Sequence, residues 1–122
     1  MLFRSVVVKT QNLTLDLANQ VVYRNMIGTE VILVTDRSPA GSTKFETESV
    51  AFKDWWSTIR LGTLAALQLI HGSVAGLIIQ IDCPKVQITD PQYDQSDNVS
   101  MMGCNFALQP NIGNDEFVLT VK

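Results

Sequence analysis

The sequence predicts a mainly β (α+β) fold: an antiparallel β-sandwich or barrel of about seven strands with one flanking α-helix. Two observations lead to this prediction. Several short segments alternate apolar and polar residues with a period of two, which is typical of half-buried strands. Only Val50–Arg60 repeats its apolar residues with the period of a helix. The chain has 122 residues, the size of one domain, so we expect residues 1–122 to form a single domain.

A long hairpin between Gly62 and Asp90 is expected at the centre of the sheet. Two apolar runs flank a turn bracketed by Gly72 and Gly76, and the second run is rich in β-branched residues. The first run, Leu61–Ile70, is rich in Leu and Ala, so helix propensity alone favours a helix there. Glycines at both ends of this short run favour a strand. Both interpretations are kept open.

Four segments before the hairpin are predicted to lie in strands. Val6–Val8 begins the first of them. Leu13–Leu17 alternates with a period of two, and we expect it to pair with Val21–Arg24 across a turn at Ala18–Gln20. Glu30–Thr35 forms a further strong strand.

Asp36–Ser42 is predicted to be an exposed loop, because it consists almost entirely of residues that favour turns. At the start of the chain, Met1–Ser5 has no turn or cap leading into the first strand. We therefore expect these residues to be a remnant, and the domain to lack an N-terminal portion.

The predicted helix at Val50–Arg60 would begin after Ser49, a residue type that favours N-caps, and would end at Gly62. Its apolar face consists of Phe52, Trp55, Trp56 and Ile59. Neighbouring helical residues differ in direction by about 100°, so the two tryptophans cannot both point inward. One is expected in the core, and the other at the edge of the face, where it covers a loop or contacts a partner subunit.

Four segments follow the hairpin. Pro91–Asn98 is predicted to be a polar loop, and Val99–Leu108 a strand. Pro110–Asn114 is expected to turn, and Glu116–Lys122 to close the chain as a strand with alternating apolar residues.

The sequence contains no recognisable catalytic or metal-binding constellation. His71, the one histidine, is expected to be an ordinary turn residue at the hairpin tip. Cys83 and Cys104 lie far apart within predicted strands, and we expect two buried, reduced thiols. Asp94 and Asp97 lack the ligand spacing of a calcium loop. We therefore predict no enzyme activity, no metal and no cofactor.

The composition argues against binding to a phosphate backbone and against a membrane-spanning segment. Nine basic and twelve acidic residues give a net charge of −3, with no basic cluster of the kind that grips a phosphate backbone. No run of about 18 apolar residues is present, so we expect no membrane-spanning segment.

Several short segments are distinctive in their order. They are Asn19–Arg24, Val34–Ser42, the predicted helix, Gly62–Thr63, Gly72–Gly76, Cys83–Gln87 and Gly113–Phe117. Together they resemble the C-terminal part of the tail tube (major tail) proteins of long-tailed bacteriophages. The resemblance covers about Leu13 to Lys122 and rests on the order of elements and loop phrases, not on one diagnostic motif.

This resemblance implies a structural virion protein without catalytic residues. Six copies would close into a ring, and rings would stack into a hollow tube that conducts DNA. Its partners would be further copies of itself, other tail proteins and, transiently and non-specifically, the passing DNA. It would reside in the phage tail after assembly in the host cytoplasm. Two alternatives remain: a related ring or tube component, such as a tail terminator or secretion-system tube protein, and a small-ligand or carbohydrate-binding β-sandwich with an exposed tryptophan.

The resemblance also suggests candidate residues. The loop at Asp36–Thr43 would contact the next ring, and subunit-interface candidates are Trp55, Trp56, Arg37, Ser38 and Pro39. The mixed face of the central hairpin would line the lumen, where the candidates are Gln68, Gln80 and Asp82. An acidic chain suits such a conduit, because like charge keeps DNA from adhering to the wall.

Overall fold

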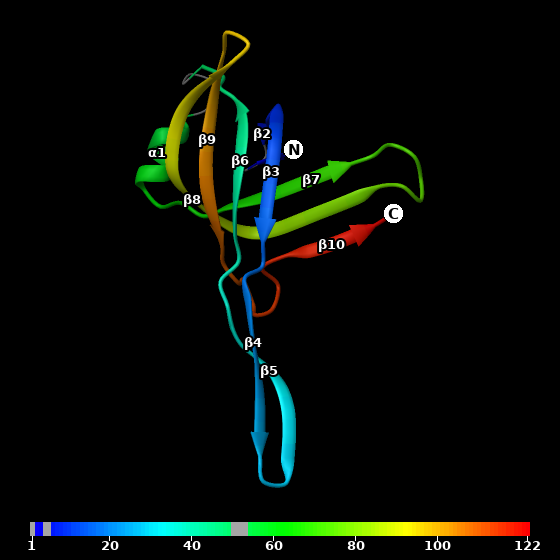
Figure 1. Ribbon diagram of the computed structural model, residues 1–122. Helices are drawn as coiled ribbons and strands as arrows, with labels where there is room; N and C mark the ends of the chain where they lie inside the picture. Colours follow the sequence, from blue (N-terminus) through cyan, green and yellow to red (C-terminus); the bar gives the residue numbers. More distant parts are fainter. Residues whose placement is uncertain (1, 4–5, 50–53) are drawn as a thin grey trace.

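Ten β-strands and one short helix are found in the described part of the computed structural model, which covers residues 2–3, 6–49 and 54–122 (Figure 1). In chain order they are β1 (Leu2–Phe3), β2 (Val6–Val7), β3 (Thr10–Asp16), β4 (Asn19–Met26), β5 (Thr29–Arg37), β6 (Ala40–Glu46), α1 (Trp55–Arg60), β7 (Ala65–His71), β8 (Ile79–Ser96), β9 (Val99–Leu108) and β10 (Val118–Val121). The fold is mainly antiparallel β with one helix, as predicted, although the strands are more numerous than the seven expected.

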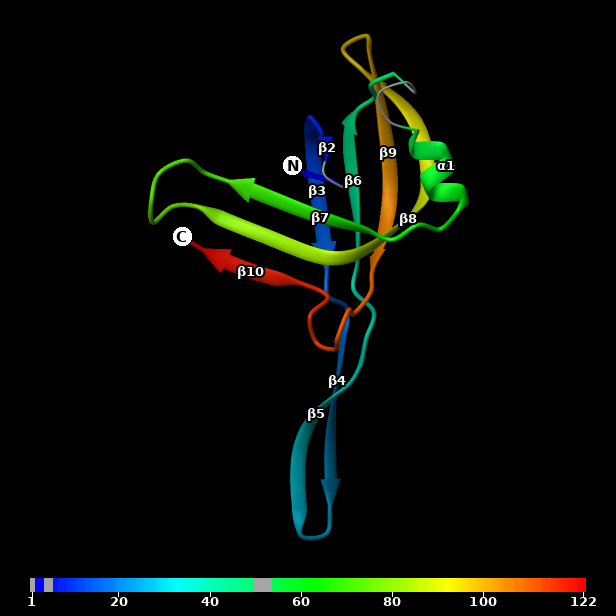
Figure 2. The ribbon, with the colours of Figure 1, turned by 180° about the vertical axis from the view of Figure 1, so that it is seen from behind.

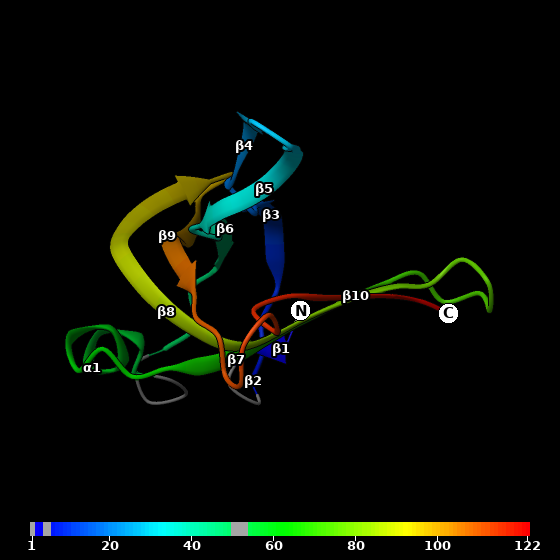
Figure 3. The ribbon, with the colours of Figure 1, turned by 90° about the horizontal axis from the view of Figure 1, so that it is seen from below.

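Eight of these strands form one antiparallel sheet, and β4 and β5 form a separate two-stranded sheet. The order in the large sheet is β2-β1-β7-β8-β9-β6-β3, with β10 also paired to β8. Strand β8 has 18 residues and joins the two halves of the sheet. Its first part pairs with β7 and β10, and its second part pairs with β9. The large sheet therefore bends around the core, as the view from below shows (Figure 3).

The core lies on the inner side of this bent sheet. Its most deeply buried side chains are Phe106, Leu67, Met102, Val86 and Cys83. Helix α1 contributes Trp55, whose ring lies 5.5 Å from that of Phe3 and 5.3 Å from that of Phe45, measured between centroids. The short helix thus closes one side of the core through a single large aromatic residue.

The central hairpin is confirmed. Strand β7 pairs along its length with the first part of β8, so the strand interpretation is confirmed for Ala65–Ile70 and the helical alternative was wrong there. Leu61 instead caps the C-terminus of α1, and the strand begins only at Ala65. Ala65 and Leu67 are buried on the inner face of β7, whereas Ala66 between them is exposed. This burial with a period of two overrides the intrinsic helix propensity of the segment. The strand at Val99–Leu108 is also confirmed, and β10 covers the middle of the predicted final strand.

The predicted pairing of Leu13–Leu17 with Val21–Arg24 was wrong. Strand β3 pairs with β6, and β4 pairs with β5. In Figure 1 strand β4 continues in the direction of β3, so the chain does not reverse at the predicted turn. Ala18 adopts a left-handed conformation there (φ 44°), which breaks the strand without turning it back.

Two predicted loops are mostly strand. Strand β5 continues to Arg37 and β6 begins at Ala40, so only two residues remain of the loop predicted at Asp36–Ser42. Strand β8 similarly continues through most of Pro91–Asn98, and the turn is limited to its last two residues. The β8–β9 ladder is irregular between residues 89 and 92. Proline fits within a strand at such an irregularity, because it has no N–H to donate to the ladder.

The helix is shorter than predicted, and its cap differs. Asp54 is the N-cap, and its carboxylate accepts a hydrogen bond from the Ser57 backbone N–H at 3.0 Å, so the prediction of Ser49 as N-cap was wrong. The predicted Phe52 lies outside the described residues. Trp55 is only 4% exposed and Trp56 is 40% exposed, which confirms that one tryptophan lies in the core and the other at its edge.

The remaining single-residue predictions concern His71 and the cysteines. His71 is the last residue of β7, immediately before the turn and not in it. Cys83 and Cys104 are buried and unpaired with each other, as predicted. Burial raises the pKa of each thiol to about 11, so both remain protonated at neutral pH.

Candidate assembly surfaces

Two arms extend from the body in different directions (Figures 1 and 2). The first, here called the β4–β5 arm, is the two-stranded sheet of residues 19–37 and continues the line of β3 and β6. The second, here called the β7–β8–β10 arm, consists of residues 68–82 and 118–122 and extends sideways. Both arms leave apolar side chains on the surface.

The β4–β5 arm is apolar on both faces. Cross-strand pairs place Val21, Tyr23, Ile32 and Val34 on one face, and all four are exposed. The opposite face carries Val22, Arg24, Met26, Val31 and Leu33. A two-stranded sheet alone is at best marginally stable in water, and this one has no covering layer in the described residues. The apolar side chains of this arm are therefore exposed in the isolated chain.

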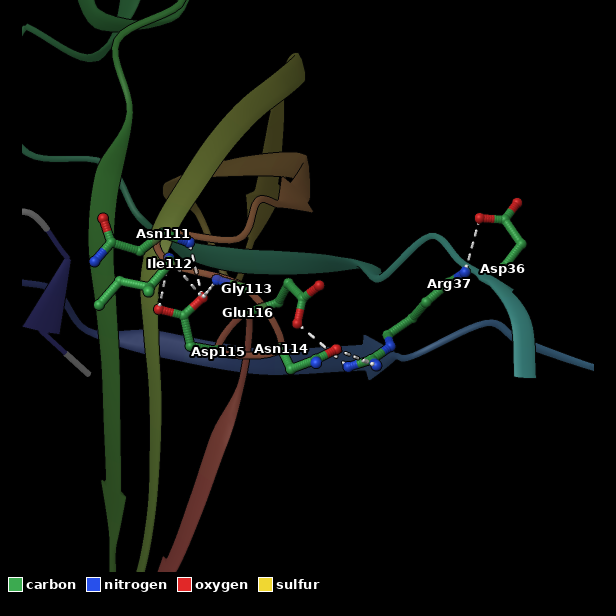
Figure 4. A network of polar contacts seen from close by, with 8 residues as sticks. All are labelled: Asp36, Arg37, Asn111, Ile112, Gly113, Asn114, Asp115 and Glu116. Carbon is green, nitrogen blue, oxygen red and sulfur yellow. Dashed lines mark hydrogen bonds and ion pairs between the residues drawn. The ribbon is translucent and has the colours of Figure 1, made fainter. Parts of the chain in front are cut away.

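A polar network fixes the base of the β4–β5 arm to the β9–β10 connection (Figure 4). The Arg37 guanidinium donates a hydrogen bond to Asn114 Oδ1 at 3.0 Å and forms an ion pair with the Glu116 carboxylate at 3.3 Å. The Glu116 side chain is only 12% exposed, so this pair is better shielded from solvent than a surface pair. Arg37 is therefore positioned to set the direction of the arm.

The turn that presents these acceptors is held by Asp115. Its carboxylate accepts hydrogen bonds from the backbone N–H groups of Asn111, Ile112 and Gly113, at 2.8, 3.1 and 3.2 Å respectively (Figure 4). These bonds, that from Asn111 foremost, lower the pKa of Asp115. The ionised carboxylate thus organises the turn from which the Asn114 and Glu116 side chains reach Arg37.

Asp115→Asn is expected to loosen this turn. In the wild type the folded pKa lies below the ordinary value of about 3.9, so the contribution to stability is complete above that value and is lost as the pH falls through the folded pKa. NMR titration should show the Ile112 and Gly113 amide resonances moving together at acid pH. In the variant they should sit near their acid positions at every pH. Asp97→Asn, in another turn, is the control, and unchanged amide resonances in Asp115→Asn would contradict the assignment.

One face of the β7–β8–β10 arm unites the three lumen candidates, beside the exposed Ile70 and Val118. Gln68 and Gln80 each donate a side-chain N–H to the Asp82 carboxylate at 2.6 Å. Lys122 Nζ donates to Gln80 Oε1, also at 2.6 Å. Whether these residues face a lumen stays a prediction, but the structure brings them together as one cluster.

The opposite face of the same arm is apolar. Cross-strand pairs place Leu69, Ile79, Leu119 and Val121 there, beyond the buried Leu67 and Cys83 on the same side. The backbone of Lys122 pairs with Ile78 and Gly76, which fastens the chain end to the hairpin loop. Gly72 turns the chain with φ 102°, and a side chain there would lie 2.4 Å from the Leu77 carbonyl oxygen. These features keep the arm extended.

Trp56 forms a surface pair with Tyr93 on the α1 side of the body. Trp56 Nε1 donates a hydrogen bond to the Tyr93 hydroxyl at 2.7 Å, and the two rings lie 5.4 Å apart. Both side chains are exposed. Trp55, in contrast, lies in the core, and Pro39 is also buried. Of the predicted interface residues, Trp56, Ser38 and Arg37 are therefore the ones that reach the surface.

A polar sheet face went unnoticed in the sequence. It is the side of β3, β6, β9 and the second part of β8 that faces away from the core. It carries Asn12, Thr14, Asp16, Ala40, Ser42, Lys44, Gln87, Thr89, Gln92, Asp94, Gly103, Asn105 and Ala107. Lys44 pairs with Asp94 and lowers its pKa, so part of the charge on this face is neutralised internally. The face could not be recognised because the first residues of β6 and the last part of β8 were predicted to be loops.

The described residues offer no metal site of three or more converging ligands. In the same part of the chain, no helix has the length and apolar character needed to cross a membrane.

The fold is similar to one found in the solved tail of a phage-like particle. Similarity to a solved structure, the tail of an empty GTA (gene transfer agent) particle computed with helical refinement and C6 symmetry, extends over 94% of this chain and 83% of that chain. The TM-score is 0.57 and the sequence identity is 15%, so the likeness concerns the fold. No protein-family model matches the sequence. No curated protein matches it either.

Proposed function

We propose that this protein is the structural subunit of a phage tail tube, in which copies close into six-membered rings and rings stack into a hollow conduit for DNA. The observation that carries the proposal is the pair of arms that leave the body in different directions with uncovered apolar faces. Each arm needs a partner, and further copies of the chain supply one. The number six is suggested by the C6 symmetry of the structurally similar tail.

Two directions of contact are what a stacked ring requires. A contact between unlike surfaces of identical copies closes a ring when the rotation allows, and otherwise propagates as a filament. Strand edges support the same conclusion: within the described residues, β3 and β10 each have an outer edge with no paired strand. Unpaired edges invite pairing with another chain, and closure into a ring removes them.

We place the polar face of β3, β6, β9 and β8 at the wall of the channel. It exposes small and polar side chains, with Asp16 and Asp94 as acids and Lys44 as the base. Such a wall offers DNA neither apolar patches nor a cationic cluster, which suits passage without retention. The cluster of Gln68, Gln80 and Asp82 is the rival wall, and a reconstruction of the tube would distinguish the two by which surface faces the channel.

The β4–β5 arm is the element that would contact the next ring. This moves the expected contact from a loop at Asp36–Thr43 to the whole arm, with Arg37, Ser38 and Pro39 at its base. The remaining assignments follow from the tail-tube proposal: location in the virion tail, assembly in the host cytoplasm, contacts with other tail proteins and transient contact with DNA.

Ile32→Glu is expected to stop stacking while sparing the ring. Ile32 is 68% exposed on the β4–β5 arm, so the carboxylate costs little in the free chain but would be desolvated at a contact between rings. Electron microscopy should show single rings where the wild type forms tubes. Ile112→Glu, at a residue 91% exposed and outside both arms, should still form tubes.

The overall test is negative-stain microscopy of the purified wild type together with sedimentation velocity. Tubes or stacked rings are expected. A protein that stays monomeric at high concentration would refute the proposal. Rings that never stack would favour the related ring component, such as a tail terminator.

A further inference from the structure

Two apolar surfaces lie on opposite sides of the body. Figure 3 shows the β7–β8–β10 arm extending to one side and α1 lying on the other, and Figures 1 and 2 agree. The first surface is the apolar face of the arm, which carries Leu69, Ile79, Leu119 and Val121. The second, here called the α1 surface, is built on the contacting pair of Trp56 and Tyr93, with the exposed Leu61 at the C-cap of the same helix.

The apolar arm face is a continuation of the core beyond the end of the body. Leu67 and Cys83 are buried at its root, and along the same face Ile79, Leu119 and Val121 become exposed. These apolar side chains continue the core beyond the elements that cover it in one chain. Another copy of the chain could cover them. The polar cluster of Gln68, Gln80 and Asp82 lies on the other face of the arm, together with Ile70 and Val118, so the hydrogen-bonded side chains of the arm are on that face.

The α1 surface presents two preorganised aromatic side chains. The hydrogen bond and ring contact between Trp56 and Tyr93 hold two large aromatic side chains in place before any partner arrives. Preorganised aromatic residues lose little conformational entropy on binding and are enriched at energetically dominant positions of interfaces. Leu61 follows directly at the C-cap of the helix and is 76% exposed.

We infer that within a ring the apolar face of the β7–β8–β10 arm of one copy packs on the α1 surface of the next. This inference rests on the proposed ring assembly and assigns its lateral contact. The two surfaces are different and face opposite ways, so each copy uses one on each side. Such a head-to-tail contact repeats around a ring and leaves the β4–β5 arm, which points elsewhere, for stacking.

Thiol cross-linking between two variants tests the contact directly. One preparation carries Val121→Cys and the other Leu61→Cys, both at exposed positions. Mixed and treated with a short bismaleimide, they should give a covalent dimer containing one chain of each variant. Neither variant alone should give this dimer. The wild type is the control for Cys83 and Cys104, which are buried and whose pKa of about 11 keeps them unreactive.

Charge substitutions supply a second measurement. Val121→Glu and Trp56→Glu should each lower ring affinity by about tenfold or more in sedimentation, while thermal melting shows a folded chain. Ile112→Glu and Ile32→Glu should retain rings. Rings that form normally in Val121→Glu and Trp56→Glu, without the cross-linked dimer, would overturn this lateral contact and leave the tail-tube proposal standing. A wild type that never associates would overturn both.

Discussion

Trp55→Glu is expected to abolish folding. Trp55 is buried between Phe3 and Phe45, so the substitution removes the aromatic core of α1 and places a carboxylate among apolar rings. Loss of a buried tryptophan costs about 3–5 kcal/mol, and an uncompensated buried charge costs several more. The sum approaches the whole stability of a domain, which is about 5–15 kcal/mol. Circular dichroism should show no cooperative thermal transition.

The adjacent tryptophan is the matched control. Trp56→Glu makes the same chemical change one residue away, but at a side chain that already reaches solvent. The variant should melt cooperatively. Apart from the loss of the contact with Tyr93, its free energy of unfolding should fall by about 1 kcal/mol or less. Equal destabilisation by the two substitutions would show that the helix is seated differently from the arrangement described.

Gly41→Ala is expected to cause the second-largest loss. Gly41 lies in β6 where β3 and β9 approach from both sides, and an added Cβ would lie 2.2 Å from the Thr14 carbonyl oxygen and 2.5 Å from Phe106 Cζ. Neither group can yield easily, because one is backbone and the other is buried. Overpacking of this kind costs about 1–3 kcal/mol, and here the upper end applies. The melting temperature should fall by on the order of 10 °C.

Gly103→Ala provides the comparison in the same sheet. The nearest atom to a Cβ at Gly103 is the Gln92 carbonyl oxygen at 4.0 Å, which is ordinary contact. Alanine should therefore be neutral or slightly stabilising, since glycine weakens a strand. If denaturant unfolding gave the two variants the same free energy, the close approach at Gly41 would not exist.

The alternation of apolar and polar residues was sufficient to predict the strands that cover the core. The alternation in β7, β8 and β9 reflects burial on one face, and that burial is what fixes a strand. Strand partners were harder, because β3 alternates and Val21–Arg24 is rich in strand-forming residues, but nothing local shows that β3 and β4 continue in one line instead of folding back. The sequence Ser38–Ser42 resembled a loop because turn-forming residues also serve where strands pass closely, and Gly41 is present for that reason.

The candidate surfaces were partly accessible from sequence. The helical period separated Trp55 from Trp56, since neighbours on a helix point in different directions. The partnership of Trp56 with Tyr93 and that of Arg37 with Glu116 each join residues far apart in the chain, so they require the fold. The cluster at Asp82 arises from cross-strand register, which a single sequence does not specify.

The contacts of Arg37 with Asn114 and Glu116 at the base of the β4–β5 arm have a mechanical consequence. The ion pair of Arg37 with Glu116 connects the separate β4–β5 sheet to the body, and the Arg37 side chain is 35% exposed to solvent and its ions. Ion pairs of this kind weaken as ionic strength rises. In a tube built from such subunits, the contacts between rings would bend more easily than the rings themselves. The bending stiffness of the tube would therefore decrease at high salt concentration.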